Sequence, residues 1–171
     1  YKDGGITVTG GEPLMQIDFV LELFTKAHER GIHTCLDTSG IAYRPDGNPQ
    51  WLEKMDKLCE VTDLVMLDIK NIDKEGHKTL TGFSVENILD CARYLDEIGK
   101  DVWIRHVLVT GNDNHEDKLS FSDRDEQLEE LSEFISTLSN VKKVEVLPYH
   151  TLGALEYSKM GMPYKLEDID P

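Results

Sequence analysis

Two kinds of segment alternate regularly along this chain, and few architectures can accommodate both. Apolar runs rich in β-branched residues occur at about 5–9, 32–37, 63–70, 101–109 and 143–149. Amphipathic segments fill most of the gaps, at about 16–30, 50–60, 84–98 and 125–139. The first pattern predicts buried strands and the second predicts helices. Such alternation favours an α/β protein with a parallel sheet, either doubly wound or curved into part of a (β/α) barrel.

Length and charge narrow the class of protein further. The 171 residues predict a single domain covering 1–171. The net charge of −15 argues against a nucleic-acid or anionic-membrane surface, because such surfaces need clustered Lys and Arg. Cys35, Cys59 and Cys91 are too far apart for a CxxC motif and odd in number, which favours a reducing cytoplasm. We expect neither a signal peptide nor a membrane span.

The sequence Gly10-Gly11-Glu12-Pro13 directly follows the first predicted strand. A glycine has no Cβ, so paired glycines let a ligand approach the backbone closely. The Glu12 carboxylate can accept hydrogen bonds from an amino group, which suits an amino-acid-like ligand. The alternative is a simple strand-to-helix turn with a solvated glutamate.

A second candidate feature lies on the third predicted strand. Because side chains alternate along a strand, Met66, Asp68 and Lys70 share one face. Two opposite charges then lie at the carboxyl end of a run that otherwise reads as buried. They form either a structural ion pair or part of a binding site, and we favour the site because buried pairs stabilise proteins weakly.

Other strands contribute polar residues near the same end. The second ends in Asp37 and Thr38, a pattern that also fits a turn or a helix cap. Arg105 lies inside the fourth run, where it needs an anionic partner, and His150 follows the last run. Binding groups of α/β sheets assemble at the carboxyl ends of strands. The sequence therefore predicts that Glu12, Asp37, Asp68, Lys70, Arg105 and His150 converge on one edge of the sheet.

Five motifs, in order, resemble those of a known family. They are Gly10-Gly11-Glu12-Pro13, His33-Thr34-Cys35-Leu36-Asp37-Thr38-Ser39-Gly40, Asp63-Leu64-Val65-Met66-Leu67-Asp68-Ile69-Lys70, Trp103-Ile104-Arg105 and Leu147-Pro148-Tyr149-His150. Together they span nearly the whole chain. The sequence resembles the radical S-adenosylmethionine enzymes that activate glycyl-radical enzymes, and is most similar to those that act on pyruvate formate-lyase. The family fold is a partial (β/α)6 barrel, which agrees with the alternation of segments.

The resemblance implies roles for individual residues. Gly10, Gly11 and Glu12 would hold the amino group of S-adenosylmethionine, and Asp68, Lys70 and His150 would contact its ribose and carboxylate region. The residues that match a monovalent-cation site beside this cofactor are Asp37, Thr38, Met66, through its backbone oxygen, and Asp68. Arg105 would help to dock the glycine loop of a partner protein. A Lys ammonium suits a carboxylate, and oxygen ligands suit a hard cation.

The chain also departs from the family pattern. The family's CxxxCxxC loop, whose three thiolates bind a 4Fe–4S cluster, has no counterpart here, and Cys35 matches a family strand cysteine. We expect the first strand and the final helix of the barrel to be missing, with both ends cut. The sequence therefore predicts no catalytic residue in this fragment and no activity for the fragment alone.

The activity implied for a complete family member is an oxidoreductase reaction. A reduced 4Fe–4S cluster, supplied with electrons by a donor such as flavodoxin or ferredoxin, cleaves S-adenosylmethionine to methionine and a 5′-deoxyadenosyl radical. That radical removes a hydrogen atom from a backbone glycine of a partner such as pyruvate formate-lyase. The cofactors carry the difficult chemistry, and the protein orients them and excludes water. Gly111 and the acidic loop at 112–125 could contribute to docking of the partner.

Two alternative functions remain open from the sequence. Lys70 beside Asp68 in a barrel mouth could form a Schiff base, as in an aldolase-like enzyme without a metal. The other alternative is a non-catalytic remnant that lacks the cluster but still binds S-adenosylmethionine or a glycyl-radical enzyme.

Overall fold

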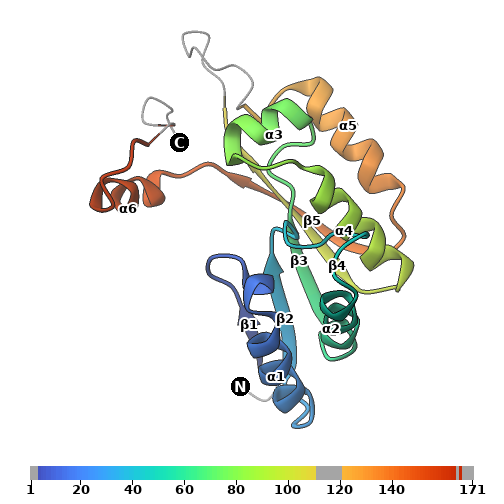
Figure 1. Cartoon of the computed structure of the whole chain (residues 1–171). Coiled ribbons are helices and arrows are strands. Elements are labelled where there is room, and N and C mark those ends of the chain that lie inside the picture. The colour runs from blue at the N-terminus through green and yellow to red at the C-terminus, as the bar shows by residue number, and fades with distance from the viewer. Residues whose placement is uncertain (1–3, 111–120, 165, 167–171) are drawn as a thin grey trace.

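A computed structural model describes residues 4–110, 121–164 and 166, and the strands of these residues form one sheet (Figure 1). They are β1 (Gly5–Val8), β2 (His33–Thr38), β3 (Leu64–Asp68), β4 (Val102–Leu108) and β5 (Val141–Pro148). All neighbouring strands are parallel, and their order β1-β2-β3-β4-β5 follows the sequence. A parallel sheet with this order is the arrangement found in barrels and partial barrels.

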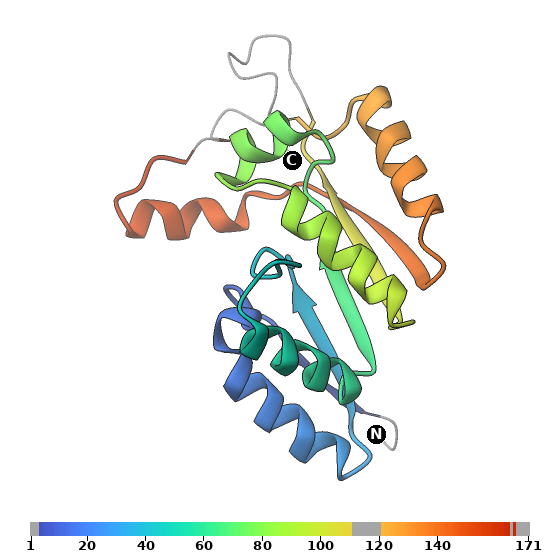
Figure 2. The same cartoon turned by 45° about the vertical axis from the view of Figure 1, so that its right-hand side comes forward.

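Helices connect successive strands. They are α1 (Ile17–His28), preceded by the short helix η1 (Pro13–Gln16), α2 (Pro49–Glu60), α3 (Lys74–Thr81), α4 (Glu86–Glu97) and α5 (Asp125–Ser136). After β5 come η3 (Thr151–Gly153) and α6 (Ala154–Lys159). Because parallel crossovers are right-handed, a sheet whose order follows the chain carries its crossover helices on one face. Figure 1 and Figure 2 show α1, α2, α4 and α5 along one side of the curved sheet.

The hydrophobic core lies between the sheet and these helices. Alternate strand residues are fully buried there and pack with apolar side chains of the helices: Leu36, Val65, Leu67 and Ile104 from the strands, and Phe24, Leu58, Ile88 and Leu95 from the helices. The other residues of β3, Leu64, Met66 and Asp68, are only partly buried. One face of the sheet is therefore buried against the helices, and the opposite face is only partly buried and can carry polar side chains such as Asp68.

Local sequence explains where two of the helices begin. The Asn48 side chain accepts a hydrogen bond from the Gln50 N–H at 2.8 Å, just before α2. The Asp73 side chain accepts one from the Gly76 N–H at 2.6 Å, at the start of α3. Such side chains satisfy N–H groups that have no partner within the helix.

The five predicted strands and four predicted helices are confirmed, with ends shifted by a few residues. The helices α3 and α6 were not predicted. The predicted polar loop at about 110–124 lies largely outside the described residues, as do Gly111 and most of the acidic segment 112–125. Within the part of the chain that the structure describes, no helix combines the length and apolar character needed to cross a membrane.

Candidate functional site

Four charged side chains meet where β2, β3 and β4 end. The Arg105 guanidinium donates through Nη2 to Asp37 Oδ1, and through Nε to Asp68 Oδ1 at 2.9 Å. The Lys70 ammonium lies 3.0 Å from Asp68 Oδ2, and the Thr9 hydroxyl donates to Asp37 Oδ2 at 3.0 Å. The side chains of Asp37, Asp68 and Arg105 are 14, 16 and 19% exposed. The cluster is thus a partly buried group with two negative and two positive charges.

Strand register explains why these side chains meet. Asp37 on β2 pairs with Met66 on β3, and Asp68 on β3 pairs with Arg105 on β4. Register partners in a sheet project from the same face, so both aspartates and the arginine lie opposite the helical layer. Of the six residues predicted to converge, the structure brings Asp37, Asp68, Lys70 and Arg105 into contact with one another. Contacts of these residues with a ligand stay predictions.

The Glu12 carboxylate is fully engaged within the protein. Its Oε1 accepts hydrogen bonds from the Leu14 N–H at 3.0 Å and the Thr38 hydroxyl at 2.5 Å. Its Oε2 accepts from the Ser39 N–H at 3.0 Å and the Ser39 hydroxyl at 2.6 Å. A carboxylate offers about four acceptor positions. The Glu12 side chain therefore fastens the loop after β1 to the end of β2, and its contact with an amino group of a ligand stays a prediction.

The two glycines before Glu12 leave their backbone open. Gly10 has a φ of 128°, which residues with a Cβ rarely adopt. A Cβ added at Gly10 or Gly11 would have no atom of the described residues within 4 Å. The backbone of both glycines is therefore exposed and uncrowded, and its contact with a ligand stays a prediction.

The Thr38 hydroxyl is engaged within the protein. Its side chain is 2% exposed, and its hydroxyl donates to Glu12 and accepts from the Gly40 N–H at 2.9 Å. Side chains alternate along β2, so this hydroxyl lies on the face opposite to that of Asp37. The Thr38 hydroxyl is thus engaged away from Asp37, and the predicted contact of Thr38 with a cation stays a prediction.

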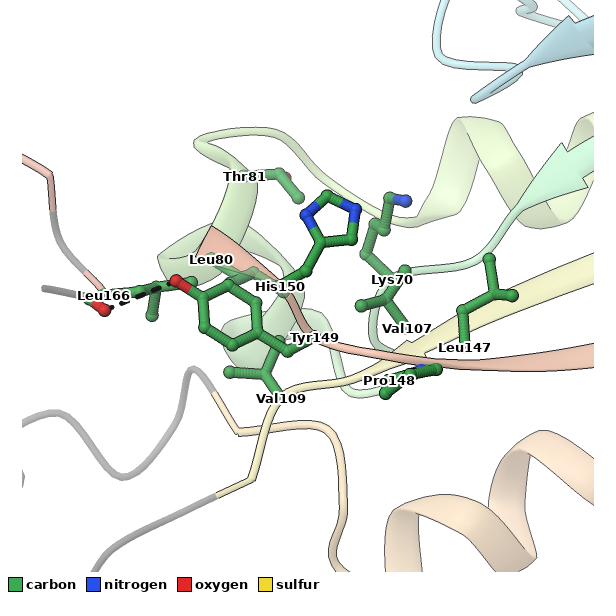
Figure 3. Close-up of a pocket in the computed structure, with 10 residues that line it drawn as sticks. All are labelled: Lys70, Leu80, Thr81, Val107, Val109, Leu147, Pro148, Tyr149, His150 and Leu166. Atoms are coloured by element: carbon green, nitrogen blue, oxygen red, sulfur yellow. Dashed lines mark hydrogen bonds between the residues drawn. The ribbon is translucent and has the colours of Figure 1, made fainter. Parts of the chain in front are cut away.

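A mostly apolar cleft lies beside the charged cluster. It has a volume of about 530 Å³, and its lining includes Lys70 and His150. The remaining lining residues are Leu80, Thr81, Val107, Val109, Leu147, Pro148, Tyr149 and Leu166. Figure 3 shows the Lys70 amine and the His150 ring on the same side of the cleft. The volume falls in the range of small-molecule sites, and a few polar groups in an apolar lining are typical of them.

The cysteines do not fit an iron–sulfur cluster. Cys35, Cys59 and Cys91 are all buried and lie in different elements. Burial raises the pKa of the Cys35 thiol and raises that of Cys59 to about 11. Thiolates, not thiols, bind iron. Among the described residues, moreover, no three His, Cys, Asp or Glu side chains lie close enough together to hold a metal ion.

His77 on α3 was not identified from the sequence. Its side chain is 2% exposed, and its Nδ1 lies 2.9 Å from the Phe83 carbonyl oxygen. Burial lowers the pKa of His77, and the neighbouring Lys70 ammonium lowers it further. Its Nε2 has no hydrogen-bond partner within the described part of the chain. The buried ring is therefore neutral near pH 7 and lies close enough to Lys70 to sense its charge.

This lowered pKa predicts a pH-dependent stability. The pKa of His77 is below 6.5 in the folded chain, so the unfolded chain binds a proton first as the pH falls. The contribution of neutral His77 to stability is complete above about pH 6.5 and is lost as the pH falls towards the pKa of the folded chain. Over this range the free energy of unfolding changes by at most about 1.4 kcal/mol per pH unit. Urea unfolding at several pH values between about 7.5 and 5 gives the free energy of unfolding as a function of pH. This free energy should fall less steeply with decreasing pH in His77→Gln than in the unmodified chain. The exposed His28→Gln is the control, and equal slopes in all three proteins would contradict the prediction.

The fold and the charged edge define an α/β protein of the partial-barrel class, with a charged cluster and a cleft towards the carboxyl ends of its strands. A family model described as the radical SAM superfamily, where SAM is S-adenosylmethionine, matches residues 1–122. The chain therefore belongs to the radical S-adenosylmethionine superfamily.

Curated relatives specify the class further. A pyruvate formate-lyase-activating enzyme of Streptococcus mutans is 52% identical over 98% of this chain and 60% of its own length. One of Listeria monocytogenes is 48% identical over 98% of this chain and 63% of its own length. The chain thus spans less than two thirds of these relatives.

A solved structure supports the same class. It is a domain of a pyruvate-formate lyase-activating enzyme from Bacteroides vulgatus, with a TM-score of 0.70 and 26% sequence identity. The match covers 86% of this chain and 81% of that domain. The predicted family and the partial-barrel fold are confirmed.

Proposed function

We propose that this chain forms the S-adenosylmethionine-binding part of an enzyme that activates a glycyl-radical enzyme such as pyruvate formate-lyase. The observation that carries the proposal is the cluster of Asp37, Asp68, Lys70 and Arg105, in a chain 45–52% identical to activating enzymes over 98% of its length. Bound S-adenosylmethionine would supply the adenosyl group that takes a hydrogen atom from a glycine of the partner.

The described residues suit the parts of S-adenosylmethionine. The Lys70 ammonium, at the border between cluster and cleft, would bind the carboxylate. The second oxygen of Asp68 would accept from the ribose hydroxyls, and His150 would lie against the nucleoside. The backbone carbonyls of Gly10 and Gly11 would accept from the amino group, with Glu12 holding that backbone in place. The apolar cleft would exclude water from the adenosyl group.

Finer parts of the proposal concern a cation and the partners. A monovalent cation would bind the Asp37 and Asp68 carboxylates together with the backbone oxygens of Thr38 and Met66, since hard cations prefer oxygen ligands. Arg105 would contact the glycine loop of the partner. An electron donor such as flavodoxin or ferredoxin would serve the complete protein in the cytoplasm.

A second candidate is a protein that binds S-adenosylmethionine or a glycyl-radical enzyme without itself holding a cluster. The described residues offer no thiolate set for iron, so no redox step is assigned to them. The Schiff-base alternative is weaker, because Lys70 is paired with Asp68 and the relatives are activating enzymes.

Lys70→Ala should weaken S-adenosylmethionine binding about 10- to 100-fold, because a charged hydrogen bond contributes about 1.5–3 kcal/mol. Isothermal titration calorimetry on the chain measures this. Lys74→Ala is the matched control, since Lys74 pairs with Glu86 on the exposed surface. Undetectable binding by the unmodified chain would contradict the proposed function. Equal affinities of Lys70→Ala and the unmodified chain would contradict the role of Lys70.

A further inference from the structure

Three polar side chains near the carboxyl ends of β3 and β4 are buried outside the charged cluster. Asn71, His106 and Ser122 are 1, 2 and 1% exposed. Burying a polar group is unfavourable unless it forms hydrogen bonds, so the partners of these side chains show what they hold in place. Each of the three bonds to the backbone of another segment. Together they join the loop after β3 to the end of β4 and to residues 121–122.

The His106 ring lies between two carbonyl oxygens. Its Nδ1 is 2.7 Å from the Ile69 oxygen, and its Nε2 is 3.0 Å from the Ser122 oxygen. A carbonyl oxygen only accepts hydrogen bonds, so a ring nitrogen can bond to it only by donating a proton. The contact with Ile69 is the shorter of the two, which favours a proton on Nδ1. His106 then holds the Ile69 carbonyl from the buried face of β4.

Ile69 directly precedes Lys70, and β3 has already ended at Asp68. The Ile69 N–H donates to the Arg105 carbonyl oxygen at 2.9 Å, and the Ile69 carbonyl faces the His106 ring. Both polar groups of this peptide backbone are thus bonded to consecutive residues of β4. The segment is therefore fixed one residue before Lys70.

The backbone on the other side of Lys70 is held as well. The Asn71 amide donates to the Phe121 carbonyl oxygen at 3.1 Å and accepts from the Asp73 N–H at 2.9 Å. The Lys70 side chain itself is 35% exposed and points to Asp68 and the cleft (Figure 3). A partly exposed lysine therefore projects from a backbone that buried side chains hold on both sides.

We propose that His106 is a positioning residue for Lys70: the bond from its Nδ1 to Ile69 fixes the backbone from which the Lys70 ammonium reaches its partners. The inference rests on the proposed function in one respect, namely that Lys70 binds the carboxylate of S-adenosylmethionine. Arg105 and His106 are adjacent on β4, so their side chains project from opposite faces. Arg105 contacts Asp68 from one face, and His106 holds Ile69 from the other. A group held in place before its ligand arrives loses less entropy on binding.

The protonation of the ring can be observed directly in the unmodified chain. A long-range ¹H–¹⁵N NMR correlation shows which ring nitrogens carry a proton, and the signals of His106 are those that disappear in His106→Gln. We expect a proton on Nδ1, whether or not Nε2 carries one too. A ring protonated on Nε2 alone would turn an unprotonated nitrogen towards the Ile69 oxygen and would overturn the proposal.

Two substitutions separate the two bonds of the ring. The amide nitrogen of an asparagine can take the place of Nδ1, and that of a glutamine can take the place of Nε2. His106→Asn should therefore keep the bond to Ile69, and His106→Gln should keep only the bond to Ser122. Each is the matched control of the other, because both leave space in the same part of the core.

The ¹H–¹⁵N NMR signal of the Lys70 ammonium, identified by its absence from Lys70→Ala, reports the effect. It should stay in place in His106→Asn and move towards the signals of exposed lysines in His106→Gln. The signal of Lys74, which pairs with Glu86 on the surface, should be the same in all proteins. Equal Lys70 signals in His106→Asn and His106→Gln would contradict the positioning role.

Calorimetry with S-adenosylmethionine adds a functional measurement. His106→Gln should bind it about tenfold more weakly than His106→Asn, because a lysine that is not held in place pays more entropy on binding. Equal affinities of the two variants would show that the position of Lys70 does not depend on His106. If the unmodified chain does not bind S-adenosylmethionine, the proposed function fails. The two NMR experiments still decide whether His106 holds Lys70 in that case.

Discussion

Replacing Glu12 with alanine should lower the free energy of unfolding by about 3 kcal/mol, one of the two largest effects that we expect. Four donors would lose their acceptor, among them the buried Thr38 hydroxyl and two groups of Ser39. Hydrogen bonds to a charged group contribute about 1.5–3 kcal/mol each, but bonds that share one carboxylate are not additive. Urea unfolding of the chain measures the loss.

Two further variants separate the causes of this loss of stability. One tests the negative charge of Glu12, and the other tests whether loss of any paired glutamate has the same effect. Glu12→Gln keeps one acceptor oxygen but turns an NH₂ group towards donors, so its loss should be smaller than that of Glu12→Ala. Glu22→Ala removes an exposed partner of Lys26 and should change stability little. Equal stability of Glu12→Ala and Glu22→Ala would contradict the fastening role of Glu12.

Gly40→Ala is the second substitution with a large expected effect. Gly40 has a φ of 71°, and a Cβ there would lie 2.9 Å from Leu67 Cδ1 and 3.1 Å from Cys91 Cβ. Both neighbours are fully buried. Left-handed backbone costs about 1–2 kcal/mol in a residue with a Cβ, and overpacking costs about 1–3 kcal/mol more. We expect a loss of about 3 kcal/mol, measured by thermal and urea unfolding.

Gly82→Ala separates the two causes. Gly82 ends α3 with a φ of 83°, but a Cβ there would meet no atom of the described residues within 4 Å. The left-handed backbone alone should cost about 1–2 kcal/mol at this position. If Gly40→Ala and Gly82→Ala lose the same stability, the proposed clash with Leu67 and Cys91 is wrong.

These two predictions concern the same corner of the site. Glu12 holds Ser39, and Gly40 follows directly where the chain packs against Leu67. Leu67 is next to Asp68, which pairs with Lys70 and Arg105. A rigid corner of this kind would hold the charged side chains in position before a ligand arrives, which reduces the entropic cost of binding.

The strands could be predicted because burial leaves a clear pattern. The run at about 63–70 became β3 (Leu64–Asp68), with Val65 and Leu67 in the core. The helix α3 was missed for the opposite reason. It is short, polar and contains Gly76, and it is delimited by the cap at Asp73 and by Gly82 rather than by an apolar stripe.

The sequence by itself determined which strands form and that their polar ends share one edge, because parallel strands point the same way. Tertiary structure alone decided which groups pair there. Glu12 bonds to Ser39 across 27 residues, and Arg105 bonds to Asp37 across 68. Such contacts depend on strand register and side-chain rotamers, which local patterns do not specify. For the same reason only the folded chain shows that Glu12 is occupied by its own neighbours and that Arg105 bridges Asp37 and Asp68.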